Sequence, residues 1–152
     1  MSEPISFTSS TMRFGIPLLF SGQAQKEFYV NEAHNLLDAL IHPNIQGVGA
    51  VPPVSPAEGE MWLVANAAQD AWASHDNKIA LYQSGAWIFV EPIPGMRVFD
   101  TGTGQFWLFD MEWVMADAPE IPQGGTSIDA EARNAIAELI EVLRKSGILP
   151  RN

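Results

Sequence analysis

Hydrophobic residues in the middle of the chain occur in short runs separated by polar turns. Six runs rich in β-branched and aromatic residues predict strands at 61–64, 79–82, 87–90, 96–99, 106–109 and 113–115. Twice, at 81–87 and 108–113, an apolar pair runs into a tight polar turn and then a tryptophan. Each copy predicts a β-hairpin, because Ser and Gly, or Asp, occupy the turn. Short strands joined by local turns predict a small antiparallel meander or sandwich.

Both faces of the predicted strands are apolar. Alternation places Phe106 and Leu108 on one face of their strand, and Trp107 and Phe109 on the other. A strand that is apolar on both faces is typical of a sheet that is covered on both sides. We therefore expect one face of the sheet to meet another layer or another subunit.

Two segments have the periodicity of amphipathic helices. The first lies between Asn31, the predicted N-cap, and Pro43, and its apolar stripe consists of Ala33, Leu36, Leu37, Leu40 and Ile41. The second covers residues 128–146, with the stripe Ile128, Ala132, Ile136, Leu139, Ile140 and Leu143. Thr126 or Ser127 is its predicted cap, and Gly147 its stop. This helix either packs across the β unit or bundles with copies of itself.

The remaining segments complete the predicted domain organisation. Residues 1–13 predict a flexible arm, and the apolar run that follows is broken by Gly15 and Pro17, so it predicts an extended segment. Residues 43–60 are rich in Pro and Gly and predict irregular structure. The predicted organisation is an arm at 1–13, a helix plus antiparallel β domain at 14–117, a Pro/Gly linker at 118–127, and a C-terminal amphipathic helix and tail at 128–152. The predicted fold class is α+β, mainly β.

Composition adds an expectation of association. The chain has 152 residues, of which 47% are hydrophobic and 17% charged, and this is a high apolar share for a small soluble monomer. The formal net charge is −10 and the basic residues are scattered, which argues against nucleic-acid binding and against attraction to anionic membranes. The sequence starts without a signal-peptide pattern and contains no apolar stretch of membrane-spanning length. We therefore expect no membrane insertion.

Candidate chemistry is sparse. The chain has no cysteine, which excludes disulfides, thiolate metal sites and cysteine nucleophiles. His34, His42 and His75 show no metal-ligand spacing, and Asp110 with Glu112 is interpreted as a pair of solvated turn acids. The sequence therefore predicts no catalytic, metal-binding or cofactor-binding residues, and no cofactor.

The aromatic residues have one binding interpretation. An exposed indole face can stack on the apolar surface of a sugar ring. Most of the tryptophans are expected to be core or interface anchors, but Trp72 lies in a stretch of small residues. A possible glycan contact is therefore predicted at Trp72 with the neighbouring turn residues His75 and Asp76, and a small carbohydrate-binding module is the alternative function.

Several motifs resemble a known family. They are the run from Ile16 to Glu27 with its segment Gly22-Gln23-Ala24-Gln25-Lys26, then Asn31-Glu32-Ala33, Leu37-Asp38-Ala39-Leu40, Ser55-Pro56-Ala57-Glu58-Gly59, Ala71–Ala80, and the hairpin Gly85-Ala86-Trp87-Ile88-Phe89. Together they resemble a family of phage-associated domains of unknown function found in alphaproteobacterial phages, prophages and gene transfer agents. The resemblance covers about residues 14 to 116, and the family brings no catalytic residues with it.

The resemblance implies a virion structural protein of a head spike or tail fibre that helps the particle attach to the host surface. Longer relatives carry a further receptor or depolymerase region, so we expect a base or adaptor role for this chain. The expected partners are copies of itself, as a trimer, and other virion proteins (capsid, portal/tail or fibre), with host surface polysaccharide as a further possibility. The expected location is the virion, assembled in the bacterial cytoplasm. The predicted oligomer or virion interface consists of Ile16, Leu18, Phe20, Trp107, Phe109, Ile136, Leu139 and Leu143.

Overall fold

A computed structural model describes residues 9–19, 22, 26–120, 124 and 129–150. Its elements are, in chain order, α1 (Lys26–Ile41), β1 (Asn44–Ile45), β2 (Val48–Gly49), β3 (Met61–Val64), the short 3₁₀ helix η1 (Asp70–Trp72), β4 (Ile79–Gln83), β5 (Ala86–Val90), β6 (Arg97–Asp100), β7 (Gln105–Asp110), β8 (Glu112–Met115) and α2 (Ala130–Lys145). The predicted α+β, mainly β class is confirmed. All six predicted strands are present.

The strands form two four-stranded sheets. The first sheet has the order β2-β3-β4-β5 and the second the order β1-β6-β7-β8. Four of the pairings are antiparallel, but β1 pairs with β6 and β2 with β3 in parallel. The antiparallel pairings expected between neighbouring predicted strands are present, and most of residues 43–60 is irregular as predicted. The two parallel pairings come from two short strands within 43–60 that the sequence did not predict. The chain after α1 contributes one short strand to each sheet, because its backbone groups find open strand edges there.

Two hydrophobic clusters explain why the strands are apolar on both faces. The main cluster contains Ala39 of α1 with Met61, Leu63, Ile79 and Leu81 of the first sheet and Val98 of the second. A second cluster lies on the opposite face of the first sheet and is centred on Trp72. The segment between β3 and β4, which contains η1, covers this face of the first sheet.

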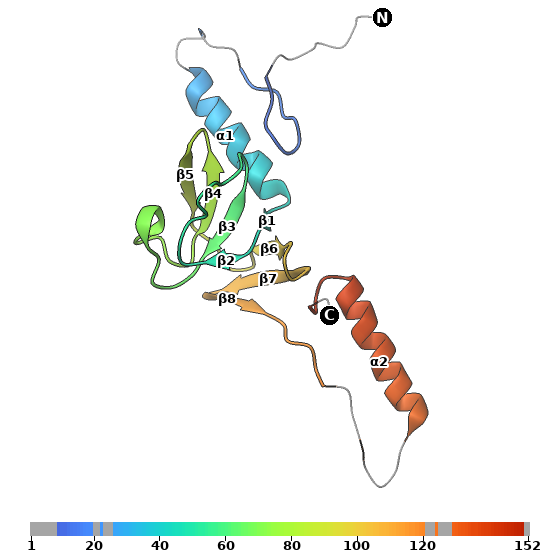
Figure 1. Cartoon of the computed structure of the whole chain (residues 1–152). Helices are drawn as coiled ribbons and strands as arrows, with labels where there is room; N and C mark the ends of the chain where they lie inside the picture. The colour runs from blue at the N-terminus through green and yellow to red at the C-terminus, as the bar shows by residue number, and fades with distance from the viewer. Residues whose placement is uncertain (1–8, 20–21, 23–25, 121–123, 125–128, 151–152) are drawn as a thin grey trace, which may run out of the picture.

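The β4–β5 hairpin has the turn that its sequence predicted. Ser84 and Gly85 have φ values of 51° and 79°, as a two-residue type I′ turn requires, and Gln83 pairs with Ala86 beside it. The tip of the hairpin lies beside the middle of α1 (Figure 1), where Gln83 and Ser84 face Asn31, Glu32 and Asn35 across a groove. It forms one wall of the site described below.

Helix α1 differs from its prediction in two respects. It begins at Lys26, so Asn31 lies inside the helix and is not its N-cap. The predicted apolar stripe is not a core face, because Ala33, Leu37 and Ile41 are exposed, and the buried residues of the helix are Glu27, Asp38 and Ala39. A polar stripe of α1 is directed inward, since it binds the backbone of the preceding segment.

Helix α2 confirms the predicted C-terminal helix. Its N-cap is Asp129, whose side chain accepts a hydrogen bond from the backbone N–H of Ala132 at 2.9 Å. The predicted caps Thr126 and Ser127 lie outside the described residues. Gly147, at φ 74°, ends the helix in a Schellman motif, with its N–H donating to Arg144 O and the N–H of Ile148 donating to Leu143 O. Figure 1 shows α2 standing beside β7 with its C-terminal end nearest the sheet.

Candidate functional site

The N-terminal segment is bound to α1 by side chains of the helix. Arg13 N donates to Asp38 Oδ2 at 2.8 Å, and Phe14 N donates to Asp38 Oδ1 at 2.7 Å. The Arg13 guanidinium donates to the carbonyl of Ala39 at 2.6 Å and to that of His42, which satisfies carbonyl groups at the C-terminal end of the helix. Within the predicted arm at 1–13, Arg13 is therefore bound to α1, and residues 1–8 lie outside the described part.

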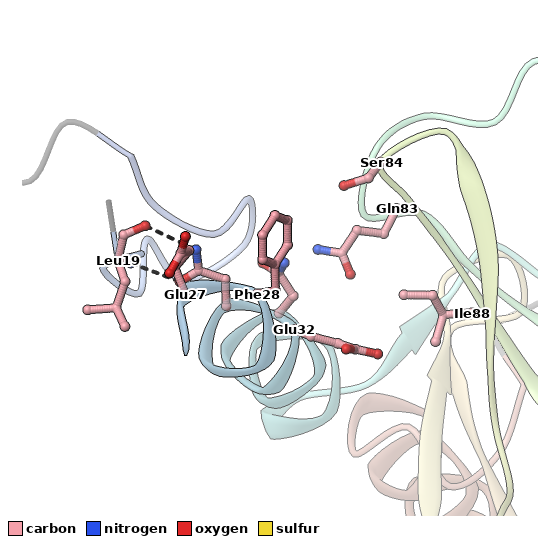
Figure 2. Close-up of a pocket in the computed structure, with 9 residues that line it drawn as sticks. Leu19, Glu27, Phe28, Glu32, Gln83, Ser84 and Ile88 are labelled. Atoms are coloured by element: carbon pink, nitrogen blue, oxygen red, sulfur yellow. Dashed lines mark hydrogen bonds between the residues drawn. The ribbon is translucent and has the colours of Figure 1, made fainter. Parts of the chain in front are cut away.

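The same segment continues along the helix toward its N-terminal end. Leu19 N donates to Asn31 Oδ1 at 2.8 Å, and Asn31 Nδ2 donates to Leu19 O at 3.1 Å; the dashed lines at Leu19 in Figure 2 mark this pair of bonds. His34 Nδ1 donates to Pro17 O at 3.0 Å. Gly22 N donates to Glu27 Oε1 at 3.1 Å. Each contact satisfies a backbone group of a segment that also folds back on itself, with Thr11 N donating to Ile16 O and Leu18 N donating to Ser9 O.

A groove lies between this segment, α1 and the β4–β5 hairpin, and we call it the α1–hairpin groove (Figure 2). Its volume is about 430 Å³, and it is lined by Leu19, Glu27, Phe28, Asn31, Glu32, Asn35, Gln83, Ser84 and Ile88. Leu19, Phe28 and Ile88 provide apolar walls. The polar groups are side-chain amides, one hydroxyl and two carboxylates, with no basic residue among them.

The groove can select a ligand by charge and shape. Carboxylates and amide oxygens accept hydrogen bonds from donors, and carboxylates attract positive charge. Phe28 is 72% exposed and provides an aromatic surface beside them. These groups suit a ligand that combines a cationic or donor-rich group with an apolar part. In the described part of the chain, no group of three or more His, Asp or Glu side chains could hold a metal ion.

Of the predicted glycan-contact residues, Trp72 is buried, His75 is half-buried and Asp76 is exposed. Trp72 has 0% exposure and packs edge-on against Trp87, with ring centroids 5.1 Å apart. The prediction that its indole face is available to a sugar is therefore wrong. His75 stacks on Phe89 at 3.6 Å, and Asp76 Oδ1 accepts from Ala68 N at 2.9 Å, so both residues shape the turn and its packing.

The other tryptophans also have internal partners. Trp107 Nε1 donates to Asp100 Oδ2 at 3.2 Å, and Trp113 Nε1 donates to Asn77 O at 2.8 Å, which connects β8 to the turn before β4. Trp62 Nε1 donates to Glu60 Oε1. Sequence analysis interpreted most tryptophans as structural anchors, and these bonds agree with that interpretation.

The residues predicted to form an oligomer or virion interface differ in how far they are buried. Ile16, Leu18, Phe109 and Leu143 are half-buried, whereas Ile136 and Leu139 are exposed on α2. Trp107 packs against the main core cluster, so its side chain contacts other residues of the same domain. Phe20 lies outside the described residues.

Sequence reasoning missed the groove. The signal was present as polar residues at helical spacing in α1, where Glu27, Asn31 and Asn35 are each four apart. These residues follow an apolar extended segment, and together the two features indicate a helix that binds a strand-like segment through polar side chains.

These features define a small two-sheet α+β domain in which buried polar side chains bind backbone and an open groove lies against one helix. The chain matches, over residues 30–114, the family described as "protein of unknown function (DUF2793)". The match covers more than half of the chain and includes both sheets, so the protein belongs to that family. A comparison with curated proteins gives no match. No helix in the described part of the chain combines the length and the apolar character that crossing a membrane requires.

Proposed function

We propose that the protein is a non-enzymatic structural component of a phage-like particle, acting as the base or adaptor of a head spike or tail fibre during attachment to the host cell. The sequence resemblance to phage-associated domains supports this proposal. The hydrogen bonds of two buried carboxylates support the non-enzymatic part of the proposal. Asp38 accepts from the backbone of the N-terminal segment, and Asp100 accepts from Gly102 N, Thr103 N and the Trp107 indole. These acids serve structural roles.

The observation that carries the proposal is the exposed apolar face of α2. Leu139 is 58% exposed and Val142 59% exposed, and Ala132 and Ala135 lie on the same side of the helix. The four positions follow a spacing of three and four residues, which is the spacing of a coiled-coil seam. Soluble monomers rarely expose such a continuous apolar surface. We propose that this seam joins copies of the chain, with a trimer as the expected state.

A second apolar surface lies on α1. Phe28, Tyr29, Leu37 and Ile41 are exposed, and Tyr29, Ala33, Leu37 and Ile41 repeat every four residues on one side of the helix. Figure 1 shows α1 and α2 on opposite sides of the β domain. Two separate apolar surfaces suit an adaptor, which must contact its own copies and another particle protein at the same time.

The test is association with particles. The protein, carrying a peptide tag at its native locus, should band with nuclease-resistant particles in a density gradient and be visible on them by immunogold labelling. Its deletion should leave particle assembly intact and reduce adsorption to host cells. A protein that stays entirely in the soluble fraction while particles form and adsorb normally would refute the proposal.

The alternative of a carbohydrate-binding module is less favoured. Its predicted contact Trp72 is buried, and the indole N–H groups of Trp62, Trp107 and Trp113 are occupied within the domain. Isothermal titration with purified capsular polysaccharide tests it directly. Saturable binding by the isolated protein would restore this alternative.

A further inference from the structure

The outer edge of β5 is an unpaired strand edge. β5 is the last strand of the first sheet and pairs only with β4. In the β4–β5 register, Gln83 pairs with Ala86 beside the two-residue turn and Leu81 pairs with Ile88. Because the pair that flanks a two-residue turn is hydrogen-bonded and the pairs then alternate, the backbone N–H and C=O groups of Ala86, Ile88 and Val90 bond to β4. The N–H and C=O groups of Trp87 and Phe89 are therefore directed away from β4.

No described residue pairs with these outward backbone groups of Trp87 and Phe89. The strand sequence Ala-Trp-Ile-Phe-Val contains none of the charged or proline residues that commonly protect sheet edges from pairing with another chain. Such an edge is a template for an added strand.

The α1–hairpin groove lies on one face of this edge. Ile88 lines the groove, together with Phe28 and Glu32 of α1. Figure 2 shows the Glu32 carboxylate directed toward the strand that carries Ile88. Glu32 is exposed and has no ion-pair partner among the described residues, whereas Glu91 at the end of β5 is paired with Lys78 at 3.0 Å. The groove therefore offers an unused negative charge beside an unused strand edge.

We propose that β5 binds an extended segment of another protein as an added antiparallel strand, and that this segment has the local pattern apolar–basic–apolar. Its middle residue lies opposite Ile88, so its side chain shares the Ile88 face and reaches Glu32. The two flanking residues lie opposite Trp87 and Phe89 and exchange backbone hydrogen bonds with them. Their side chains meet the aromatic face formed by Trp87, Phe89 and His75.

The negative charge of the groove favours a basic segment as the added strand. The lining of the groove contains two carboxylates and no basic residue, and the whole chain has a net charge of −10. A second acidic copy is therefore a poorer occupant than a basic segment, because like charges meet across the pair. The proposal concerns a binding edge and is independent of whether the chain is a particle component.

The test uses nine-residue peptides with alternating Thr and Val and a central Lys, capped at both ends and titrated into the full-length protein by calorimetry at up to millimolar concentration. The Lys peptide should bind, and a matched peptide with a central Glu should bind about tenfold or more weakly. Methylation of the amide nitrogens of the two flanking Val residues should abolish binding. Methylation of the backbone amide nitrogen of the central Lys, which is directed away from β5, should leave binding unchanged.

Charge reversal supplies the control on the protein side. Glu32→Lys should lower the affinity for the Lys peptide by about tenfold or more and raise the affinity for the Glu peptide. Asp117→Lys makes the same charge change at an exposed residue remote from β5 in the fold, and should alter neither affinity by more than about twofold. Both variants should keep the wild-type thermal midpoint.

Three results would overturn the proposal. The first is no binding of the Lys peptide at millimolar concentration, and the second is equal binding of the Lys and Glu peptides. The third is a protein dimer that excludes the peptide and dissociates on Phe89→Pro, because a second copy would then occupy the edge.

Discussion

Arg13 and Asp38 bind each other's backbone across the contact between the N-terminal segment and α1. Arg13 N donates to the Asp38 carboxylate at 2.8 Å, and the Arg13 guanidinium lies 3.4 Å from the Asp38 carbonyl oxygen. Asp38 is 3% exposed, so this carboxylate is buried with its hydrogen bonds satisfied. The contact places the segment that carries Leu19 along one wall of the groove.

Removal of the Asp38 carboxylate should release this segment. We expect Asp38→Ala to lower the free energy of unfolding by about 2 kcal/mol, since two partly buried backbone N–H groups lose a charged acceptor. Chemical denaturation measures the change. Hydrogen exchange should show lost protection at the amides of Arg13 and Phe14, while Asp117→Ala, at an exposed acid, should leave both measurements unchanged.

Trp72 should be essential for stability. We expect Trp72→Ala to cost about 3–5 kcal/mol, because a fully buried indole is replaced by a cavity. Phe28→Ala, at a residue that is 72% exposed, should change stability by less than about 0.5 kcal/mol. Equal effects of the two substitutions in a denaturant titration would contradict the burial of Trp72. Any loss of host adsorption in a Trp72 variant should accordingly be traced first to unfolding.

Gly147 combines a left-handed backbone with a close packing contact. A Cβ at this position would lie 3.2 Å from a ring carbon of Phe106, and φ is 74°. We expect Gly85→Ala, where φ is 79° and the added atom meets open space, to cost about 1 kcal/mol. Gly147→Ala should lower the free energy of unfolding by more than Gly85→Ala does, because Phe106 must also move. Thermal unfolding of both variants measures the difference, and equal costs would show that Phe106 accommodates the extra methyl group.

The exposed seam of α2 should determine oligomeric state. We expect the wild-type protein to sediment as a trimer and the double variant Leu139→Glu, Val142→Glu to sediment as a monomer with unchanged far-ultraviolet circular dichroism, because the new charges repel across an apolar seam. Glu138→Gln, next to the seam, serves as the matched control and should remain trimeric. A wild-type protein that is monomeric at micromolar concentration would refute the association.

Peptide binding at β5 and association through α2 are separable. The Glu32→Lys variant should keep the wild-type sedimentation behaviour, and the α2 double variant should keep the wild-type affinity for the Lys peptide, since Glu32 and Leu139 belong to different helices on opposite sides of the β domain (Figure 1). Analytical ultracentrifugation and calorimetry on the same preparations measure both properties. Coupled changes would place the two surfaces in one interface.

Local patterns in the sequence determined the strands, the β4–β5 turn and α2. Alternating apolar residues around Ser84-Gly85 can form only a narrow set of hairpins, and the stripe of α2 with Gly147 beyond it specifies a helix and its end. These features depend on neighbours a few residues apart, so the sequence is sufficient to predict them.

Tertiary structure decided which surfaces are buried. The apolar stripe of α1 predicted an amphipathic helix, but its buried side contains Asp38, because the Asp38 carboxylate satisfies backbone groups from a segment about 25 residues away. Trp72 appeared isolated in sequence, and only the folding of η1 onto the first sheet places it beside Trp62 and Trp87. The parallel pairings of β1 and β2 likewise depend on strands much later in the chain. A periodic pattern shows that an element has an apolar side, but the partner of each side depends on contacts between residues distant in sequence.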